Sequence, residues 1–581
     1  MIVLGLNIGH NATACLLKDG KIDACVSEER FSRIKNHHGV PFKSIEWVLK
    51  EKAISISDVD LVVLDDQYPI EKNPYFGKHF LWAYKNKSRK NKLFSYMGYK
   101  YPKLFQRYYN LRDFISSKEK NRMAIKMGLA SILGIDKGKI IVLDHHLMHA
   151  FATIGNLDRK KKWLIFTLDG EGSGLCASVN VYDGGSVERI SESRKTASIG
   201  YFYGIATLML GMKPLEHEFK VMGLAPYAKS HSVDEIYQKI RTLFSISEDL
   251  VFHSKFSMPF SDHFFKEETK FVRFDTLAAA VQKLTEDLCV EWISKAIKKT
   301  GIRNIALSGG VFMNVKANKR ISEISDVQDI FVMPSCGDES NAIGACWYGY
   351  KIFSERNNLP FLPVSIKELY LGPEYDFSYV EKMIKEKNLH NKYKIKKTKN
   401  INREVAQLLA RGEIVARCSG KSEWGARALG NRSILANPVH QDTIRILNET
   451  IKDRDFWMPF TPSVLDTFSK KYIANPKEIF SPYMAITFDS TSLAREKLPA
   501  AMHPYDFTIR PQIVTKEHNP DYYDLIQNFQ KLTGTGAILN TSFNLHGEPN
   551  VLTPEDALHT LENSSLKYLA LGNYLLEKKI I

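Results

Sequence analysis

The stretches IVLGLNIGHNATACLLKDGKIDACVS (residues 2–27) and WLIFTLDGEGSGLCASVNVYDGGSVERI (residues 163–190) decide the fold, because both follow one order of elements. Each predicts a strand ending in a polar, glycine-containing turn, then a second strand, a tight Asp-Gly turn and a returning strand. Asn7 ends the opening strand of the first copy, and Asp169 ends that of the second. This repeat predicts a duplicated α/β domain whose two halves face each other across a cleft.

A duplicated domain of this kind resembles the actin, hexokinase and Hsp70 superfamily, in which the two glycine-bearing turns hold phosphates. NIALSGGVFMNVKANKRI (residues 304–321) adds a buried strand, two glycines and a helix-like pattern. That order brings backbone N–H groups near a phosphate or an adenosine. The proline-containing stretch at residues 356–374 marks a boundary, so we expect one domain at 1–365 and a second α/β domain at 366–581.

The composition narrows the class of protein. The chain has 581 residues, of which 44% are hydrophobic and 25% charged, which excludes a mostly disordered, collagen-like or coiled-coil protein. No run of about 18 apolar residues predicts a membrane span, and the first residues do not resemble a secretory leader. The seven cysteines contain no C-x-x-C pair, which argues against a disulfide framework or a thiolate zinc site. We therefore expect a cytoplasmic protein.

The net charge of +15 is concentrated in one segment. Residues 71–125 hold 14 Lys and Arg against three Asp and Glu, so they carry +11 of the total, and they also hold thirteen aromatic residues. We call this segment the basic-aromatic insertion. Because the rest of the chain is nearly balanced, nucleic acid is not expected as a general partner. We expect the insertion to shape an acceptor site or to contact an anionic glycan or a membrane surface, the alternative being a solvated appendage.

The motif LDHHLMHA (residues 143–150) predicts a metal site. His145 and His149 are four residues apart, so on a helix both imidazoles leave the same face. Asp169, at the end of a repeated strand, and Asp338, in a turn before a helix, add two oxygen donors. Two histidines and carboxylates suit divalent iron, zinc or manganese. The alternative is that one histidine ends a helix and that the aspartates are caps.

The C-terminal domain carries a group of cations. GKSEWGARALGNRSILANP (residues 420–438) places Arg427 and Arg432 five residues apart among glycines, so that both guanidiniums can converge on one anion. Lys452, Arg454, Arg510 and the motif ILNTSFNLHGEP (residues 538–549) add further cations and small polar groups. This composition favours a ligand with several phosphates, or with a phosphate and a carboxylate. The chain has no GxxxxGK[ST] loop, so a nucleotide would not be held by a P-loop.

Ten motifs in collinear order resemble the O-carbamoyltransferases of nodulation factors, aminoglycosides and cephalosporins. Besides the stretches quoted above, they include SEERFSRIKNHHGVP (residues 27–41), EFKVMGLAPY (218–227), CGDESNAIGA (336–345) and KDRDFWMPF (452–460). The resemblance runs from residue 2 to about residue 558, apart from the basic-aromatic insertion. Where family members often carry Asp, this chain has Asn11, and Met458 stands where an arginine is frequent.

The resemblance implies two coupled activities. A C-terminal domain similar to threonylcarbamoyl-adenylate synthases would form carbamoyl-adenylate from carbamoyl phosphate and ATP, with Mg²⁺. An N-terminal domain similar to the tRNA threonylcarbamoyl transferase would then pass the carbamoyl group to a hydroxyl of a sugar-containing or other small-molecule acceptor. Fe²⁺ or another divalent metal would be bound by His145, His149, Asp169 and Asp338.

By motif match, the resemblance also assigns the remaining site residues. Carbamoyl phosphate and ATP would be held by Arg427, Arg432, Lys452, Arg510 and Asn540. The nucleotide part of the N-terminal cleft would be lined by Gly172, Gly309, Gly310, Asn314 and Gly337. His10 is the candidate base for the acceptor hydroxyl, because a neutral imidazole near pH 7 can accept that proton. Its alternative role is to stabilise the turn.

Two other functions remain open from the sequence. An actin-superfamily kinase or ATPase would explain the repeat and the Gly-Gly turn, but it would leave the C-terminal arginines and the two histidines without a role. A tRNA-modifying transferase is suggested by the basic-aromatic insertion, because aromatic rings beside cations bind single-stranded RNA.

Overall fold

A computed structural model describes residues 1–67, 96–104, 107, 118–258 and 261–579. It divides the chain into two compact units. Unit 1 comprises Met1–Glu28 and Asn36–Ile366, and unit 2 comprises Glu29–Lys35 and Lys367–Ile581. The seven residues Glu29–Lys35, which include helix α1 (Glu29–Ser32), therefore group with the C-terminal part of the chain, which the sequence analysis did not predict.

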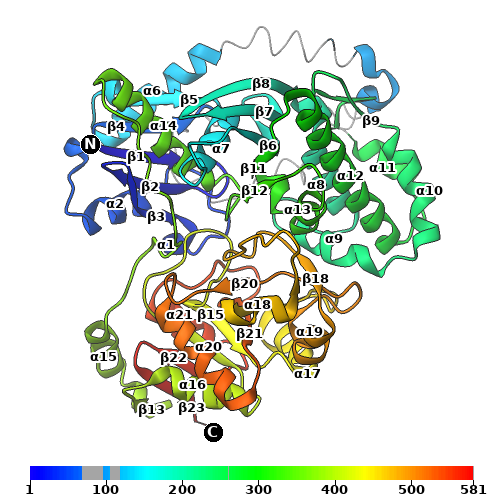
Figure 1. Ribbon diagram of the computed structural model, residues 1–581. Helices are drawn as coiled ribbons and strands as arrows, with labels where there is room; N and C mark the ends of the chain where they lie inside the picture. The colour runs from blue at the N-terminus through cyan, green and yellow to red at the C-terminus, as the bar shows by residue number, and fades with distance from the viewer. Residues whose placement is uncertain (68–95, 105–106, 108–117, 259–260, 580–581) are drawn as a thin grey trace. The chain divides into compact units, whose positions relative to one another are not determined.

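Unit 1 contains two five-stranded sheets of the same topology (Figure 1). The first has the order β3-β2-β1-β4-β5 and the second the order β8-β7-β6-β11-β12. In both, three strands form an antiparallel meander whose first strand pairs in parallel with a fourth, and a fifth strand is parallel to the fourth. The predicted duplication and the actin/Hsp70-like α/β class are confirmed. The strand bounds are β1 Ile2–Asn7, β2 Thr13–Lys18, β3 Lys21–Ser27, β4 Leu61–Asp65, β5 Ile140–Leu143, β6 Trp163–Gly172, β7 Leu175–Asp183, β8 Ser186–Arg194, β11 Asn304–Ser308 and β12 Asp329–Val332.

Helices α7 (His145–Ile154) and α14 (Ser340–Arg356) pack against each other between the two sheets (Figure 1). α14 lies on β1 and β4, whereas α7 lies on β6 and β11. Gly344 permits this packing, because a Cβ at that position would lie 1.9 Å from the carbonyl oxygen of Met148. The two helices thus bring the polar ends of both sheets close together.

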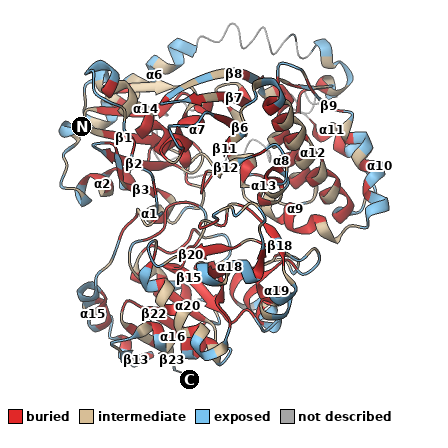
Figure 2. Ribbon diagram, in the orientation of Figure 1, coloured by how far each residue is buried: buried red, intermediate tan, exposed pale blue. Residues whose placement is uncertain are grey.

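The second half of unit 1 carries a helical layer. α12 (Phe274–Thr300) contacts α8, α9, α10 and α13. Figure 2 shows α10 exposed along its outer side, whereas β6 and α7 are buried. The other elements of unit 1 are α2 Phe42–Glu51, α6 Lys118–Leu133, α8 Ile199–Met209, α9 Glu218–Leu224, α10 Ser230–Arg241, β9 Phe244–Ile246, β10 Phe252–Ser254, α11 Asp262–Glu268 and α13 Val315–Ser322.

Most of the basic-aromatic insertion lies outside the described residues. Within residues 96–104, the ring of Tyr99 packs on His263 of α11 with centroids 5.0 Å apart, and its hydroxyl donates to Glu268 Oε1 at 3.2 Å. The end of the insertion belongs to α6, where Ile125 and Leu129 are buried. The proposed contact of the insertion with a glycan or a membrane stays a prediction.

Unit 2 is built on an eight-stranded sheet of order β13-β23-β22-β14-β15-β21-β16-β20. Alternate side chains of its central strands enter two different cores. Ala416, Ile434 and Leu539 pack with helices α15 (Phe377–Glu386) and α21 (Pro554–Glu562). Their neighbours Val415, Leu435 and Ile538 pack with α16 (Ile401–Ala410) and α20 (Pro520–Thr533). This is a three-layer α/β arrangement with helices on both faces of the sheet.

The remaining bounds of unit 2 complete its fold. The large sheet consists of β13 Tyr393–Lys397, β14 Val415–Cys418, β15 Arg432–Ala436, β16 Thr461–Leu465, β20 Gln512–Val514, β21 Ala537–Ser542, β22 Tyr568–Leu571 and β23 Tyr574–Lys578. A small sheet and four short helices comprise β17 Ile473–Ala474, β18 Phe488–Ser490, β19 Thr508–Ile509, α17 Asp442–Ile446, a π-helix Leu447–Lys452, α18 Asp466–Tyr472 and α19 Ser492–Lys497.

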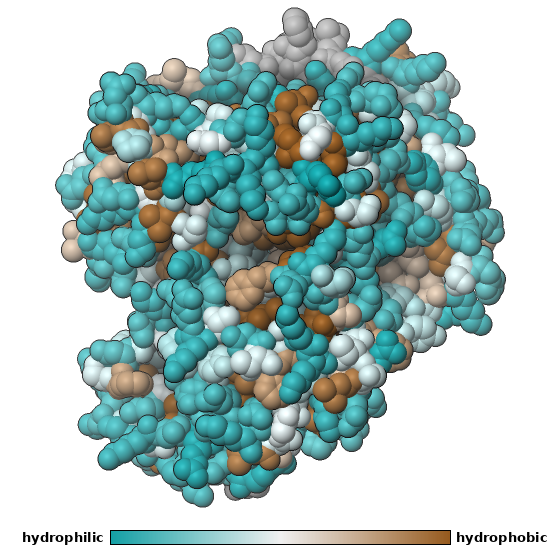
Figure 3. Space-filling model, in the orientation of Figure 1, coloured by the Kyte–Doolittle hydropathy of each residue, from teal (hydrophilic) through white to brown (hydrophobic). Residues whose placement is uncertain are grey.

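The surface view in Figure 3 is covered mainly by hydrophilic side chains, with smaller hydrophobic areas between them. Among the helices of the described residues, none has the length and apolar character needed to cross a membrane.

Candidate functional sites in the two units

The predicted metal ligands of unit 1 lie together. α7 begins directly after β5, and Asp144 caps it by accepting from the backbone N–H of Leu147 at 2.9 Å. His145 and His149 leave the same face of this helix and are fully buried. Asp169 comes from β6, and Asp338 from the turn before α14. One ligand atom from each of these four residues lies within 4.8 Å of the others.

The distances within this cluster favour a cation at its centre. His145 Nε2 and His149 Nε2 are 3.1 Å apart. Asp169 Oδ2 lies 3.1 Å from His149 Nε2 and 3.5 Å from His145 Nε2. Asp338 Oδ1 lies 3.5 Å from His145 Nε2 and 3.7 Å from His149 Nε2. Two imidazole nitrogens and two carboxylates that converge in this way are a donor set suited to a divalent metal.

The pKa shifts within the cluster also favour a bound cation. Burial lowers the pKa of His145, but the carboxylates of Asp338 and Asp65 outweigh it and hold that pKa well above its ordinary value. Burial raises the pKa of Asp169, but contacts with His145 and His149 bring it well below its usual range. Burial and the charge of Asp169 raise the pKa of Asp338, but the same two histidines outweigh them and lower it, so both candidate carboxylate ligands stay ionised and attract positive charge.

The histidine between the two candidate ligands has a different role. His146 Nδ1 lies 2.7 Å from the hydroxyl of Thr167 in β6. Burial, followed by the charges of His145 and His149, lowers its pKa to about 3. His146 thus stays neutral and ties α7 to the second sheet.

The predicted glycines pack against this cluster. A Cβ at Gly172 would lie 2.0 Å from His145 Cδ2, and one at Gly310 would lie 3.0 Å from Asp169 Oδ1. At Gly309, φ is +102° and a Cβ would lie 2.5 Å from the carbonyl oxygen of Leu168, whereas at Gly337 it would lie 2.4 Å from Glu339 Oε2. These positions need glycine for close packing, whatever ligand binds there.

Both polar atoms of the Asn314 side chain form hydrogen bonds within unit 1. Its Oδ1 accepts from the backbone N–H of Ala317 at 3.0 Å and so caps α13, and its Nδ2 donates to Gln282 Oε1 at 2.8 Å. A nucleotide contact from this side chain would have to replace one of these hydrogen bonds.

His10 lies in the turn after β1, where the side chain of Asn7 donates to its carbonyl oxygen at 2.6 Å. It belongs to a group of histidines that the sequence analysis did not single out. Burial, then the neighbouring His10 and His37, lower the pKa of His38 to about 4, and Asp338 acts on the same ring in the opposite direction. The candidate base and the candidate metal ligand Asp338 are thus both close enough to His38 to influence its charge.

Asn11, in the same turn, contacts the other repeat. Its Nδ2 donates to Glu339 Oε2 at 3.1 Å, next to Asp338. The buried carboxylate of Glu339 therefore faces an amide, where an aspartate at position 11 would face it with a second negative charge.

Unit 2 contains a cluster of cations that repel one another. Burial, followed by the charges of Arg427 and Arg454, holds the pKa of Arg510 well below its ordinary value. Burial and Arg427 lower the pKa of Arg454 to about 10. Burial, Arg454 and Lys35 likewise lower the pKa of Lys452. Lys35 comes from the segment Glu29–Lys35 and was not predicted.

Three cations of this cluster have no carboxylate partner among the described residues. Within the described chain, Lys452, Arg454 and Arg510 form no ion pair, and Arg510 Nε is buried without a hydrogen-bond acceptor. Lys452 ends the π-helix, and its Nζ donates to Asn544 Oδ1 at 2.8 Å and to Ser542 Oγ at 3.2 Å. These three cations thus have no carboxylate to balance their charge among the described residues, which favours a multiply charged anion as a ligand.

Arg432 corrects one expectation. The sequence suggested that it converges with Arg427 on one anion, but its side chain is 1% exposed and bonded to the backbone. Its Nε donates to the carbonyl oxygen of Leu552 at 3.0 Å, and its Nη1 donates to those of Ser419 and Gly420 at 2.9 and 3.0 Å. Because these bonds use the guanidinium, Arg432 holds the loops, and we leave it out of the anion site.

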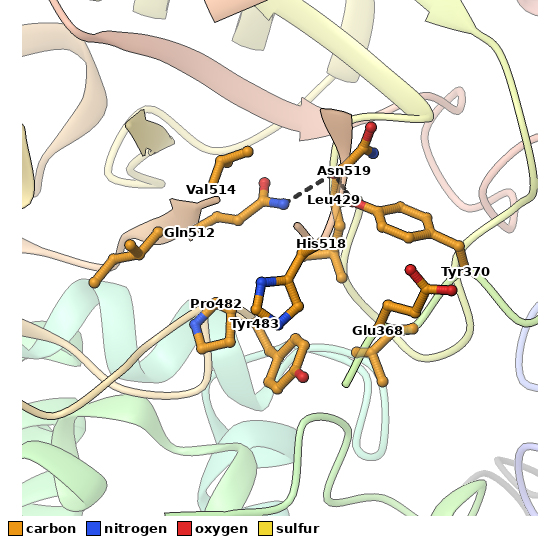
Figure 4. Close-up of a pocket in the computed structure, with 11 residues that line it drawn as sticks. Glu368, Tyr370, Leu429, Pro482, Tyr483, Gln512, Val514, His518 and Asn519 are labelled. Atoms are coloured by element: carbon orange, nitrogen blue, oxygen red, sulfur yellow. Dashed lines mark hydrogen bonds between the residues drawn. The ribbon is translucent and has the colours of Figure 1, made fainter. Parts of the chain in front are cut away.

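Asn540 also supports the loop that carries Arg427. Its Nδ2 donates to the carbonyl oxygen of Ala428 at 3.1 Å and lies 3.2 Å from Gln512 Oε1. Gln512 in turn donates to the carbonyl oxygen of Leu429 at 2.9 Å, as Tyr370 does, and both line the small pocket of Figure 4. Gln512 gave no sequence signal, because its importance comes from its position on β20.

Family comparison confirms the resemblance. Residues 2–347 match the model of the carbamoyltransferase N-terminus, and residues 406–578 match that of the carbamoyltransferase C-terminus. The chain belongs to the carbamoyltransferase family. It is thus a carbamoyltransferase enzyme, and both its clusters lie within the family's two regions.

The relatives of this carbamoyltransferase span its length. Uncharacterized protein MJ1058 of Methanocaldococcus jannaschii is 33% identical over 82% of this chain and 79% of its own. Uncharacterized protein MJ1051 of the same organism is 29% identical over 99% of this chain and 100% of its own. Nodulation protein NolNO of Sinorhizobium fredii is 28% identical over 98% of this chain and 79% of its own.

Proposed function

We propose that this carbamoyltransferase works in two steps. It forms carbamoyl-adenylate from ATP and carbamoyl phosphate in unit 2, and it transfers the carbamoyl group to an acceptor hydroxyl at the His/Asp cluster of unit 1. The observation that carries the proposal is the opposite charge of the two sites. One is a group of cations in which Lys452, Arg454 and Arg510 form no ion pair among the described residues, and the other joins two imidazoles to two carboxylates.

In unit 2, Arg427, Lys452, Arg454 and Arg510 would bind the phosphates of both substrates. For the atoms to balance, water releases inorganic phosphate from carbamoyl phosphate, and a carbamate oxygen then bonds to the α-phosphorus of ATP as pyrophosphate leaves. Negative charge develops on the phosphates in both displacements, so fixed cations lower the barrier most where that charge grows. Mg²⁺ would accompany ATP. Asn540 and Gln512 would hold the Arg427 loop in place.

In unit 1, His145, His149, Asp169 and Asp338 would hold a divalent ion, Fe²⁺ by family resemblance. Such an ion supplies Lewis-acid polarisation of the adenylate's phosphate and carbonyl oxygens when bound. His10 would take the proton of the acceptor hydroxyl as its oxygen attacks the carbamoyl carbon and AMP leaves. By family resemblance, the nucleotide part of this cleft would be lined by the backbone at Gly172, Gly309, Gly310 and Gly337, which pack against the cluster. We propose a sugar-containing or natural-product alcohol as the acceptor.

The first step can be tested without an acceptor. The protein is incubated with ATP, Mg²⁺ and [¹⁴C]carbamoyl phosphate, and label on AMP and release of pyrophosphate are measured. We expect Arg427→Ala to lose both signals and His149→Ala to keep them. Arg411→Ala, an exposed arginine of the same unit, is the matched control and should behave as wild type.

Hydrolysis of ATP that ignores carbamoyl phosphate, with no labelled adenylate, would contradict the two-step proposal. That outcome would favour an actin-superfamily kinase or ATPase, which the duplicated fold of unit 1 alone would also suit. Transfer of label to tRNA, and not to an alcohol, would favour the tRNA-modifying alternative.

A further inference from the structure

Strand β4 ends in two consecutive aspartates that both reach the first turn of α7. Asp65 is 1% exposed and Asp66 is 7% exposed. Neither belongs to the group of four candidate ligands. Two buried carboxylates at one strand end are costly unless they are bonded to donors or cations. Their partners therefore indicate what they do.

Asp65 contacts the ring of His145. Asp65 Oδ2 lies 2.8 Å from His145 Nδ1, and both side chains are fully buried. Asn341 of α14 donates to the same carboxylate oxygen at 3.4 Å. A carboxylate only accepts, so this contact requires the proton of a neutral His145 to be on Nδ1. Nε2 is then left with its lone pair toward Asp169 and Asp338.

Asp66 is linked through Ser173 to the backbone N–H of His145. It accepts a hydrogen bond from the hydroxyl of Ser173, and Ser173 Oγ in turn accepts from the backbone N–H of His145 at 2.8 Å. The other oxygen of Asp66 accepts from Arg122 Nε of α6 at 2.7 Å. The first turn of α7 is thus fixed to the glycine turn of β6, whose Gly172 packs on the ring of His145.

We propose that Asp65 is a positioning residue that holds His145 as an Nε2 ligand, and that Asp66 fixes the position of that ligand through Ser173. The inference rests on the proposed metal site, which it deepens by naming the groups behind one ligand. A carboxylate behind a ligating imidazole sets the tautomer and ring orientation and makes the ligand more basic. Metal affinity, and not only catalysis, should therefore depend on Asp65.

The test measures binding of the metal alone. Chelator-stripped full-length protein is titrated with Zn²⁺, and anaerobically with Fe²⁺, in competition with a coloured chelator and without substrates. Asp65→Asn should weaken binding by about 10-fold to 100-fold. Ser173→Ala should weaken it less, because it leaves the Asp65 contact in place. Asp58→Asn, which alters only an exposed capping turn, is the matched control and should bind as wild type.

A second readout separates positioning from simple loss of folding. In Zn²⁺-loaded protein with ¹⁵N-labelled histidine, where a ligating His145 is neutral, the wild-type His145 resonances should report a proton on Nδ1, and Asp65→Leu should move that proton in part to Nε2. Thermal unfolding of the metal-free variants checks that they fold. Asp65→Glu, which keeps the charge, should recover part of the affinity.

The outcomes distinguish this inference from the proposed function. If wild type and His149→Ala bind Zn²⁺ equally weakly, the metal site itself is wrong. If wild type binds tightly, His149→Ala does not, and Asp65→Asn matches wild type in affinity and tautomer, then the metal site stands and the role of Asp65 is refuted.

Discussion

Replacing Arg432 with alanine is expected to destabilise unit 2 and not merely to remove a ligand. Its guanidinium is buried and donates to the carbonyl oxygens of Leu552, Ser419 and Gly420 at 3.0 Å or less. A hydrogen bond to a charged group contributes about 1.5 kcal/mol at the low end of its range. Three such bonds give an expected loss of about 4.5 kcal/mol in the free energy of unfolding, a large part of an ordinary domain's stability.

Urea unfolding followed by tryptophan fluorescence measures this loss, because Trp424 is buried in the same loop. Arg411→Ala, which removes an exposed arginine of unit 2, should unfold at the wild-type urea concentration. Carbamoyl phosphate binding is measured by calorimetry at a temperature where each variant is folded. If Arg432→Ala unfolds as wild type does but no longer binds carbamoyl phosphate, Arg432 is a ligand and our interpretation of its contacts is wrong.

Three further predictions concern both sites. Gly172→Ala should weaken metal binding by at least about tenfold, because its Cβ would lie 2.0 Å from His145, whereas Gly170→Ala, whose Cβ meets nothing within 4 Å, should bind as wild type in the same chelator titration. Arg510→Met should stabilise the substrate-free protein by about 1 kcal/mol, since it relieves repulsion from Arg427 and Arg454, yet weaken ATP binding; a lower urea midpoint would contradict this. His38 has a pKa of about 4 against an ordinary 6.5, so the unfolded chain binds its proton first and stability falls as pH drops from 6.5 to 4. His38→Gln should remove about 3 kcal/mol of that pH dependence, and an unchanged pH profile of unfolding would argue against a neutral, half-buried His38.

Local patterns were sufficient for much of the fold. The alternation of residues 2–27 and 163–190, with Asp-Gly turns at 19–20 and 183–184, specifies two hairpins, and the structure has both. The spacing of His145 and His149 placed them on one helix face because a helix repeats every 3.6 residues. Asp169 could be added because the pattern predicts it at the end of a repeated strand, although β6 continues to Gly172. Asp338 could be added because it lies in the turn before α14.

Other parts of the sites could not be predicted from local patterns. Asp65 and His145 are 80 positions apart, and nothing near Asp65 in the sequence marks it as the partner of an imidazole. Lys35 precedes the main segment of unit 2, Lys367–Ile581, by more than 300 residues and still acts on Lys452, because Glu29–Lys35 folds with that segment. Arg427 and Arg432 look equivalent in the sequence, which does not show that the guanidinium of Arg432 donates to the carbonyl oxygens of remote loop residues.

The sequence alone therefore determined the duplicated α/β fold, the carbamoyltransferase family and the residue types of both clusters, because these depend on periodicity and on motifs of neighbouring residues. The tertiary structure decided which of those residues converge. It separated Arg432, whose guanidinium donates to backbone carbonyls, from Lys452, Arg454 and Arg510, which form no ion pair among the described residues. It also placed the carboxylate of Asp65 against Nδ1 of His145. Burial and distance between remote segments determine whether a charged side chain supports the fold or binds a ligand, and only the folded chain sets them.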